Sequence, residues 1–373
     1  MTATTELLVD DDALRHNAAH FAALTGGRLM AVVKADGFGH GAVARSVVEA
    51  GAGSLGVTSV AEALAVRVDG PRVPVLAWAA TVDADLEAAL LADVDLAVAG
   101  ADLLHAVGRA ARRTGRRARV HLHVDVGLSR DGCPTEEWAA LCALARLAEA
   151  RGELRVVGVM GHLSCADRPD DPRNDRERLA FAAALRTARR RALAPAVAHL
   201  AATAATVTGG GGRHDLHRVG AGLVGIDPSG TSSALRPALT LTTRVVRSRA
   251  VAAGTGVGYG HEHVTTRAGH LALLPLGYGD GLPRAASHRA EVLARGRRRP
   301  VVGLVSMDSV VVDTGDDVLH PGERVTVLGP GTDGEPTVAE WARWSGTIPH
   351  EIVTRLGSRV ARVHRRTVVG GAA

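Results

Sequence analysis

Three residues stand out in this 373-residue chain as groups that could exchange protons near neutral pH. Of its 44 lysines and arginines only Lys34 is a lysine, and its two tyrosines are Tyr259 and Tyr278. Arginine keeps its proton under physiological conditions, whereas burial can make a lysine amine neutral and able to attack a carbonyl. Lys34 is therefore a candidate for covalent attachment of a carbonyl compound as a Schiff base.

The neighbours of Lys34 favour this hypothesis over chance survival of one lysine on a surface. Lys34 ends the apolar run Leu29–Val33, and the loop after it contains Gly37, Gly39 and Gly41. In a parallel βα barrel, active sites form at the C-terminal ends of the strands. Glycines allow the backbone to approach a ligand closely. The pattern predicts a reactive amine beside a ligand-binding loop.

Short apolar runs alternate with segments of helical spacing up to about residue 235. Amphipathic segments at 12–24, 42–49 and 135–150 indicate helices. Strands are predicted at Leu29–Val33, Ser54–Val57, Val73–Trp78, Val94–Val98, Val120–Val124, Val156–Met160, Val197–Ala201 and Val219–Val224. Eight βα units predict an α/β fold with an N-terminal (β/α)8 TIM-type barrel over residues 11–235. A doubly wound open sheet is the competing fold, but no G-x-G-x-x-G follows the first strand.

The pattern after Pro237 predicts a separate, mostly-β C-terminal domain over residues 236–373, with which residues 1–10 could pack. Alternating β-branched segments there are separated by glycine-rich turns. The predicted strands are Leu239–Val251, His270–Leu276, Val301–Val312, Arg324–Leu328 and a final Arg359–Val363. A helical pattern at Thr337–Trp344, continued at Ile352–Leu356, interrupts them.

The composition excludes several classes of protein. The net charge of +5 comes from short arginine runs with few aromatic residues nearby, so we expect solvated surfaces and no nucleic-acid partner. No signal peptide is visible, and no apolar run is long enough to cross a membrane. The three cysteines, Cys133, Cys142 and Cys165, lack a zinc-like spacing and suit a reducing cytoplasm.

The segment around Lys34, Ala31-Val-Val-Lys-Ala-Asp-Gly-Phe-Gly-His-Gly41, resembles the cofactor-lysine motif of the alanine racemases, and the likeness continues through nearly the whole chain. Further motifs follow in the family's order. They are Val124-Asp-Val-Gly-Leu-Ser-Arg-Asp-Gly132, Gly158-Val-Met-Gly-His162, Arg218-Val-Gly-Ala-Gly-Leu-Val-Gly225, Gly256-Val-Gly-Tyr-Gly260, Gly277-Tyr-Gly-Asp-Gly281, Val305-Ser-Met-Asp308 and Gly322-Glu-Arg-Val-Thr-Val-Leu-Gly329. Several motifs in order are far more specific than any one of them.

The resemblance implies a cytoplasmic isomerase that uses pyridoxal 5'-phosphate (PLP). Its substrate would be a small amino acid, alanine first, whose L- and D-forms it interconverts. Lys34 would hold the cofactor and move the proton on one face of the substrate Cα. Tyr259 would act on the other face, from the partner subunit of a homodimer with shared active sites. Exchange on two faces needs two groups that both donate and accept, which arginine cannot do.

The resemblance also assigns binding roles. Arg218 would contact the pyridine nitrogen and His162 the cofactor. Thr203 would hold the phosphate with its hydroxyl, and Gly220 and Ala221 with their backbone N–H groups. The substrate carboxylate would meet Arg130, the backbone at Met307 and the nearby Asp308, while Tyr278 and Tyr259 would narrow the pocket. The alternative is that Arg218 is only a surface arginine at a strand end, and on its own Met307 would be assigned to core packing.

Four residues depart from the family pattern. Phe38 and His364 stand where the family has tyrosines near the phosphate, and Ala202 replaces an asparagine beside the phosphate-binding hydroxyl. A His364 imidazolium could restore part of the lost phosphate binding. His123 replaces a carbamylated lysine that orients the substrate-binding arginine, and we interpret it as a partner of Arg130. The two catalytic groups are unaffected, so the departures bear on substrate, cofactor affinity and rate.

Three alternatives remain open from the sequence. The first is a racemase or epimerase for another amino acid in a specialised pathway. The second is a non-catalytic PLP carrier, which would need neither the β domain nor Tyr259. The third is a metal-dependent hydrolase using His121, His123 and Asp125. We predict no metal site, because spacing in His121-Leu-His123 or His261-Glu-His263 supplies neither converging further ligands nor a second shell.

Overall fold

A computed structural model describes residues 4–212 and 214–366. Contacts divide the chain into two compact units. The barrel unit comprises Arg15–Gly37 and Ala42–Leu235. The β unit comprises the described residues up to Leu14, the short segment Phe38–Gly41, and the chain from Arg236 onward.

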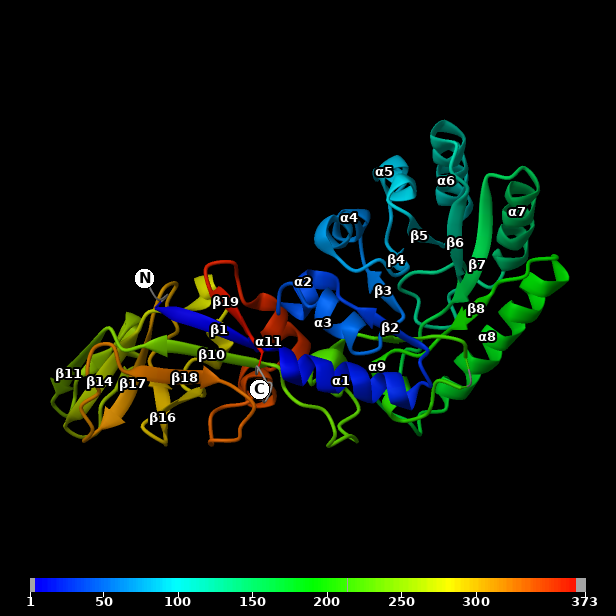
Figure 1. Cartoon of the computed structure of the whole chain (residues 1–373). Helices are drawn as coiled ribbons and strands as arrows, with labels where there is room; N and C mark the ends of the chain where they lie inside the picture. Colours follow the sequence, from blue (N-terminus) through cyan, green and yellow to red (C-terminus); the bar gives the residue numbers. More distant parts are fainter. Residues whose placement is uncertain (1–3, 213, 367–373) are drawn as a thin grey trace, which may run out of the picture. The chain divides into compact units, whose positions relative to one another are not determined.

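Eight parallel strands form the centre of the barrel unit, and Figure 1 shows them inside a layer of helices. In the order in which they neighbour one another, they are β8 (Val197–His199), β7 (Leu154–Met160), β6 (Ala118–His123), β5 (Val94–Val98), β4 (Val75–Ala77), β3 (Ser54–Val57), β2 (Leu29–Val32) and β9 (His217–Val219). Each pairs with its neighbours in parallel. The predicted α/β barrel is confirmed.

The barrel closes between β8 and β9 by isolated hydrogen bonds. Beyond the end of β8, the N–H of Arg218 donates to the carbonyl of Ala201 over 3.0 Å. Within β8 itself, the carbonyl of Ala198 accepts from the N–H of Asp215 over 3.0 Å. No ladder joins β8 to β9 in the described part of the chain, so the ring is closed but less regular beside Arg218.

Apolar side chains fill part of the barrel interior, and the helices bury their apolar faces on the outside of the strands. Met30, Leu76, Ala97 and Met160 form one buried cluster from four strands. The surrounding elements are α1 (Asp11–Leu24), α3 (Ala44–Glu49), α4 (Val60–Asp69), α5 (Leu86–Leu91), α6 (Ala101–Thr114), α7 (Trp138–Ala150), α8 (Arg173–Arg190), α9 (Thr203–Val207) and the 3-10 turn η1 (Ala221–Val224). No helix in the described ranges is long and apolar enough to cross a membrane.

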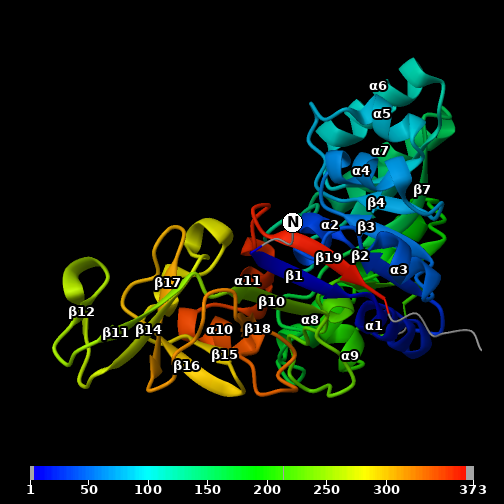
Figure 2. The ribbon, with the colours of Figure 1, turned by 60° about the vertical axis from the view of Figure 1, so that its left-hand side comes forward.

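A nine-stranded sheet is the main feature of the β unit (Figure 2). Its order is β11 (Arg247–Val251), β14 (Gly269–Leu274), β17 (Val310–Gly315), β16 (Arg297–Val302), β15 (Glu291–Ala294), β18 (Arg324–Leu328), β10 (Leu239–Arg244), β1 (Thr5–Asp10) and β19 (Ala361–Arg365). The N-terminal strand β1 is antiparallel to β10 and parallel to β19. Strands far apart in sequence thus form one edge of the sheet.

Two helices and a hairpin complete the β unit. Helix α10 (Val338–Ser345) begins with a capping box between Thr337 and Glu340, and α11 (Pro349–Arg355) follows it. The indole N–H of Trp341 donates to the carbonyl of Val327 on β18 over 2.8 Å, which anchors α10 on the sheet. The hairpin is β12 (Gly256–Val257) and β13 (His263–Val264).

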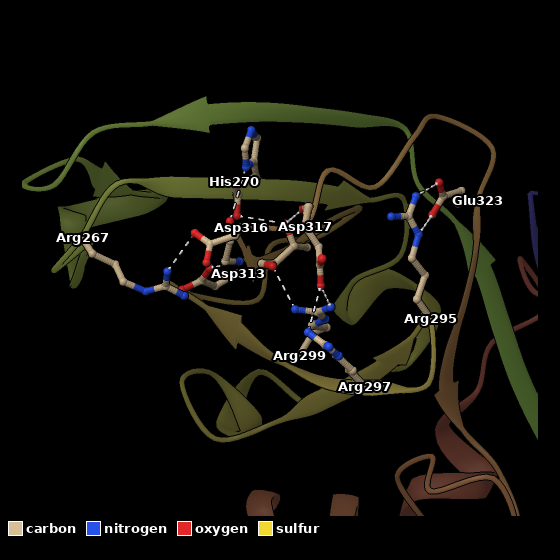
Figure 3. A network of polar contacts seen from close by, with 11 residues as sticks. Arg267, His270, Arg295, Arg297, Arg299, Asp313, Asp316, Asp317 and Glu323 are labelled. Atoms are coloured by element: carbon tan, nitrogen blue, oxygen red, sulfur yellow. Dashed lines mark hydrogen bonds and ion pairs between the residues drawn. The ribbon is translucent and has the colours of Figure 1, made fainter.

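Arginines of the β unit form ion pairs within the unit, as Figure 3 shows. Arg299 is buried, pairs with Asp317 and donates to the carbonyl of Thr314 over 2.8 Å. Arg267 lies 3.2 Å from Asp316, and Arg295 pairs with Glu323. The arginines of the run at 297–299 therefore form ion pairs with carboxylates of the same unit.

Among the predicted strands whose bounds differ from the observed ones, three differ most. The segment 219–224 is a strand only to Val219 and then turns as η1, where a Cβ on Gly222 would lie 2.4 Å from Phe21. The segment 239–251 is two strands, because the N–H of Val245 donates to Glu323 and that of Val246 to Leu273. The segment 301–312 is divided between β16 and β17 by a loop.

Candidate active site

Lys34 lies two residues beyond β2, at the start of a left-handed turn labelled α2 (Lys34–Phe38). Ala35, Asp36 and Gly37 have φ angles of 52°, 53° and 59°, and Phe38 has 56°. For a residue with a side chain this conformation costs about 1–2 kcal/mol. Such strain persists only where the surrounding structure holds it, and it clusters at functional sites.

Glu62 holds the first residue of this turn. Its Oε1 accepts the N–H of Ala35 over 2.8 Å, while its Oε2 accepts the N–H of Thr58 over 2.8 Å. Glu62 also completes a capping box with Ser59 at the start of α4. One carboxylate thus joins the β3–α4 loop to the backbone beside Lys34 and fixes where that side chain begins.

The amine of Lys34 lies in positive surroundings. Its Nζ is 5.7 Å from the centre of the Trp78 ring, which follows β4. Burial lowers the pKa of Lys34, and the guanidinium groups of Arg130 and Arg218 lower it further, against the opposing charge of Glu62. A lowered pKa makes the neutral, nucleophilic amine more abundant.

Arg218, at the centre of β9, is 4% exposed and is held by neutral acceptors. Its Nη1 donates to Nδ1 and to the carbonyl of His199, each over 2.9 Å. Its Nη2 donates to the carbonyl of Gly161 over 2.6 Å and lies 3.3 Å from His162 Nδ1. Burial, then Arg130, lowers the pKa of Arg218 to about 10, which leaves it charged at neutral pH. Within the described chain none of these acceptors is a carboxylate.

Two histidines beside Arg218 are held neutral. Burial lowers the pKa of His162 to about 3, with further lowering by Arg218, Arg130 and Lys34. Burial also lowers the pKa of His199 well below its ordinary value, and Arg218 adds to the effect. A neutral imidazole can accept a hydrogen bond from a guanidinium, so both rings serve as acceptors here.

The neutral state of His199 predicts a loss of stability in mild acid. Below its ordinary pKa of 6.5 the unfolded chain binds a proton that folded His199 refuses, so the free energy of unfolding falls as pH falls. The slope per buried group is about 1.4 kcal/mol per pH unit. Urea unfolding at roughly pH 7.5 and pH 5 should show a shallower pH dependence for His199→Gln than for the natural chain. Equal slopes in the two proteins would contradict the assignment.

Thr203 and the turn after β9 form a compact polar group. Thr203 begins α9 and is buried, and its Oγ1 lies 3.3 Å from the backbone nitrogens of both Gly220 and Gly222. Ala202 precedes the helix and supplies no side-chain cap. The structure thus brings Thr203 and the turn at Gly220–Gly222 together, and their contact with a phosphate stays a prediction. The methyl side chain of Ala202 cannot donate a hydrogen bond as an asparagine would.

Arg130 is exposed in the loop after β6, and its charge reaches Lys34, His162 and Arg218. His123, on β6, lies with Nδ1 3.3 Å from Oδ2 of Asp131. The hydrogen bond from His123 lowers the pKa of Asp131, and Arg130 lowers it slightly more. No bond joins His123 directly to Arg130 among the described residues, and Asp131 is the residue on which both act.

Tyr259 of the β unit projects into solvent. It follows Gly258, whose φ of 71° is accessible to glycine, and opens the 3-10 turn η2 (Tyr259–His261) inside the β12–β13 hairpin. Its side chain is 72% exposed. The adjacent His263 stacks on His288, whose Nε2 lies 3.6 Å from Glu262.

Two loops of the β unit bring Tyr278, Met307 and Asp308 together. The N–H of Tyr278, in η3 (Tyr278–Asp280), donates to the Ser306 carbonyl over 3.0 Å. The N–H of Gly279 donates to the Met307 carbonyl over 2.9 Å. Three ion-paired residues fix these loops, since Arg359 lies 2.7 Å from Asp308 and 3.2 Å from the buried Asp280.

His364 and Phe38, which stand where the family has tyrosines, both belong to the β unit. His364 Nδ1 lies 3.1 Å from Oδ1 of Asp11, so an acidic partner is available to a protonated ring. Phe38 is buried, with its ring 6.3 Å from that of His350. A Cβ on Gly39 would lie 2.1 Å from the Val353 carbonyl, which explains the glycine there.

The metal-like spacings are occupied by other contacts. His121 hydrogen-bonds to His199 over 2.8 Å, and His123 pairs with Asp131. Over residues 4–212 and 214–366, no three His, Cys, Asp or Glu side chains are grouped to hold a metal ion.

Sequence reasoning missed Glu62, Trp78, Asp95, Asp280 and Arg359. Trp78 was predicted only as the end of a strand, although its position after β4 matches that of Lys34 after β2. Glu62 was detectable as the acidic member of a capping box. Asp280 lies inside a quoted motif. For Asp95 and Arg359 the sequence gives no signal, because their partners are distant in the chain.

Comparisons with known proteins agree over the full length. Profiles described as the alanine racemase N-terminal and C-terminal domains match residues 9–228 and 238–364. The chain is 44% identical over 373 residues to the alanine racemase of Thermobifida fusca (strain YX), covering 99% of this chain and 100% of that one.

Solved structures show the same likeness. The alanine racemase from D-cycloserine-producing Streptomyces lavendulae superposes with a TM-score of 0.96 at 39% identity, covering 99% of this chain and 98% of that chain. The alanine racemase of Bartonella henselae with covalently bound pyridoxal phosphate gives a TM-score of 0.88 at 26% identity, covering 98% of this chain and 100% of that chain.

Proposed function

The chain belongs to the alanine racemase family, and from that premise we propose that it interconverts L- and D-alanine with pyridoxal 5'-phosphate as cofactor. The observation that carries the proposal is where its only lysine lies. Lys34 follows a barrel strand, has a lowered pKa, and shares its surroundings with two arginines. A racemase for another amino acid has no separate observation in its favour.

The residues of the barrel unit fit an anionic, ring-bearing cofactor. Arg130 and Arg218 lower the pKa of Lys34, and Arg130 also lowers that of Arg218, so a phosphate or a carboxylate would relieve the repulsion among these three groups. Thr203 and the N–H groups of Gly220 and Ala221 would hold the phosphate. The glycine at position 56 leaves room for Trp78, since a Cβ there would lie 2.7 Å from that ring.

Bound PLP would supply an electron sink that acidifies the substrate Cα–H. Lys34 would hold the cofactor and then carry a proton on one face of Cα, which requires an amine that gives and takes a proton near neutral pH. Arg218 would face the pyridine nitrogen. A guanidinium that stays charged donates to that nitrogen without protonating it, which weakens the sink and disfavours side reactions such as transamination.

Tyr259 would serve the opposite face from the partner subunit of a homodimer. A ring that is 72% exposed, held on a hairpin by a positive-φ glycine, is available to a second chain. Arg130 and the backbone at Met307 would bind the substrate carboxylate, with Asp308 fixed nearby by Arg359. His364, whose Nδ1 lies 3.1 Å from Oδ1 of Asp11, would add a phosphate contact.

We also propose a cytoplasmic location. Cys133, Cys142 and Cys165 are buried and free. Burial raises the pKa of Cys133 to about 11 and that of Cys142 to about 12, so neither is a reactive thiolate. Free, unreactive thiols need no oxidising compartment.

Reductive labelling tests the attachment site. Protein incubated with PLP and reduced with borohydride should carry the label on the peptide that contains Lys34, as read by mass spectrometry. Because Lys34 is the only lysine, the N-terminal amine is the main competing site. Lys34→Arg, which keeps the charge but not a nucleophilic amine, should carry no label at position 34. Equal labelling of that variant would overturn the assignment.

A further inference from the structure

A chain of buried polar side chains crosses the barrel interior and ends on Arg218. Arg218 Nη1 lies 2.9 Å from His199 Nδ1, and His199 Nε2 lies 2.8 Å from His121 Nδ1. His121 Nε2 lies 3.4 Å from Asp95 Oδ2. These four residues, hereafter the Asp95–Arg218 chain, come from β5, β6, β8 and β9 and are each less than 9% exposed.

Because arginine can only donate, the hydrogen bonds of the Asp95–Arg218 chain can run in only one direction, from Arg218 to Asp95. Arginine only donates, so His199 Nδ1 must accept and the ring's proton must be on Nε2. His199 then donates to His121 Nδ1, which places the proton of His121 on Nε2, facing Asp95. If His121 carried a proton on Nδ1, His199 would need one on its own Nδ1, which would oppose the N–H of Arg218.

Asp95 is suited to end the chain as an acceptor. Burial opposes its charge, but hydrogen bonds from His121 and Arg119 hold its pKa below the ordinary value. Arg119 Nε lies 2.7 Å from Asp95 Oδ1 and is half exposed. Asp95 Oδ2 also accepts from Arg119 Nη2 over 3.1 Å and lies 3.4 Å from His121 Nε2, so the carboxylate serves as an acceptor for both residues.

A glycine on β7 leaves space in the barrel interior for the Asp95–Arg218 chain. A Cβ on Gly158 would lie 2.1 Å from His121 Nδ1, so the absence of a side chain at position 158 gives the ring access to His199. The rest of the interior contains apolar residues such as Leu76 and Met160. Buried polar networks are unfavourable unless fully satisfied, and when satisfied they fix one arrangement.

We propose that Asp95, His121 and His199 are positioning residues that hold the guanidinium of Arg218 in the orientation required at the pyridine nitrogen of the cofactor, an inference that rests on the proposed function. His199 can accept from Arg218 only while the two imidazoles keep their Nε2–H forms. Asp95 sets those forms from the far end of the chain. Without it both rings can exchange protons and turn a donor toward Arg218.

Histidine tautomers can be read directly by 15N NMR of histidine-labelled protein, with and without PLP. We expect His121 and His199 to carry a proton on Nε2 and none on Nδ1 in both states. Asp95→Leu removes the acceptor at nearly constant volume and should give mixed or reversed tautomers. Arg119→Gln is the matched control, because it breaks the same ion pair but leaves the Asp95 carboxylate.

The rate of alanine racemisation should fall in the variant whose histidine tautomers change. Asp95→Leu should lower kcat roughly tenfold, as expected for losing one hydrogen bond to a charged group, with KM nearly unchanged because Arg130 is untouched. Arg119→Gln should stay within about twofold, because the Asp95 carboxylate that accepts from His121 is still present.

A His199 that carries its proton on Nδ1, or on both nitrogens, in the natural protein would overturn the proposal. Unchanged tautomers in folded Asp95→Leu would overturn it too. If Asp95→Leu does not fold, the tautomers of the natural protein and of Arg119→Gln test the proposal. Altered tautomers in Arg119→Gln would contradict the claim that Asp95 sets them. Absence of racemisation with Nε2–H tautomers would instead refute the proposed function alone.

Discussion

Lys34→Ala should lose racemisation in both directions, by about 10⁴-fold or more in kcat, because one side chain supplies both cofactor attachment and proton transfer on one face. The chain has no second lysine to substitute for it. The measurement is the rate of D-alanine formation from L-alanine, and of the reverse reaction, with PLP in excess.

Lys34→Arg separates the two contributions of the lysine. It restores the positive charge beside Glu62 and Trp78 but cannot give up its proton near neutral pH. Both variants should therefore be equally inactive. Substantial activity in Lys34→Arg would show that charge, rather than a titrating amine, is what the reaction needs.

Tyr259→Phe should lower racemisation by roughly 10²–10⁴-fold, the usual contribution of one positioned acid or base. Its signature is asymmetric. With Lys34 intact, one enantiomer of alanine should still exchange its Cα hydrogen with solvent deuterium, while the other enantiomer should not. The hydroxyl of an exposed hairpin tyrosine contributes little to folding, so the melting temperature should be nearly unchanged.

Tyr278→Phe is the matched control, because it alters the only other tyrosine. It should change KM for alanine more than it changes exchange, and both enantiomers should still exchange. If Tyr259→Phe continued to exchange both enantiomers at the rate of the natural protein, the group serving the second face would have to be another residue.

The barrel could be predicted because each of its strands has a recognisable local sequence pattern. Buried parallel strands such as Ser54–Val57 and Val94–Val98 are continuous apolar runs, and the structure keeps their bounds. The errors came where tertiary contacts end a strand that the sequence would continue. Val245 and Val246 are both β-branched, yet they pair with different neighbours, so the predicted strand breaks between them.

The site was predictable where a residue type is rare or a motif is local, and not where geometry decides. Lys34 was singled out by its scarcity, and Tyr259 by the motif Gly256-Val-Gly-Tyr-Gly260. The left-handed turn after Lys34 could not be, because Ala35, Asp36 and Phe38 normally avoid that conformation. Asp95 reaches Arg218 only through two imidazoles on other strands, a relation that no spacing in the sequence encodes.

Incubating the PLP-loaded protein with L-alanine in D2O, and reading both chirality by chromatography and Cα deuteration by NMR, tests the central claim most directly. We predict D-alanine that carries deuterium at Cα, with L-alanine and D-alanine approaching equal amounts. PLP attached to Lys34 without any Cα exchange would contradict racemisation and favour a carrier protein. Exchange with another amino acid but not with alanine would keep the mechanism and contradict the substrate.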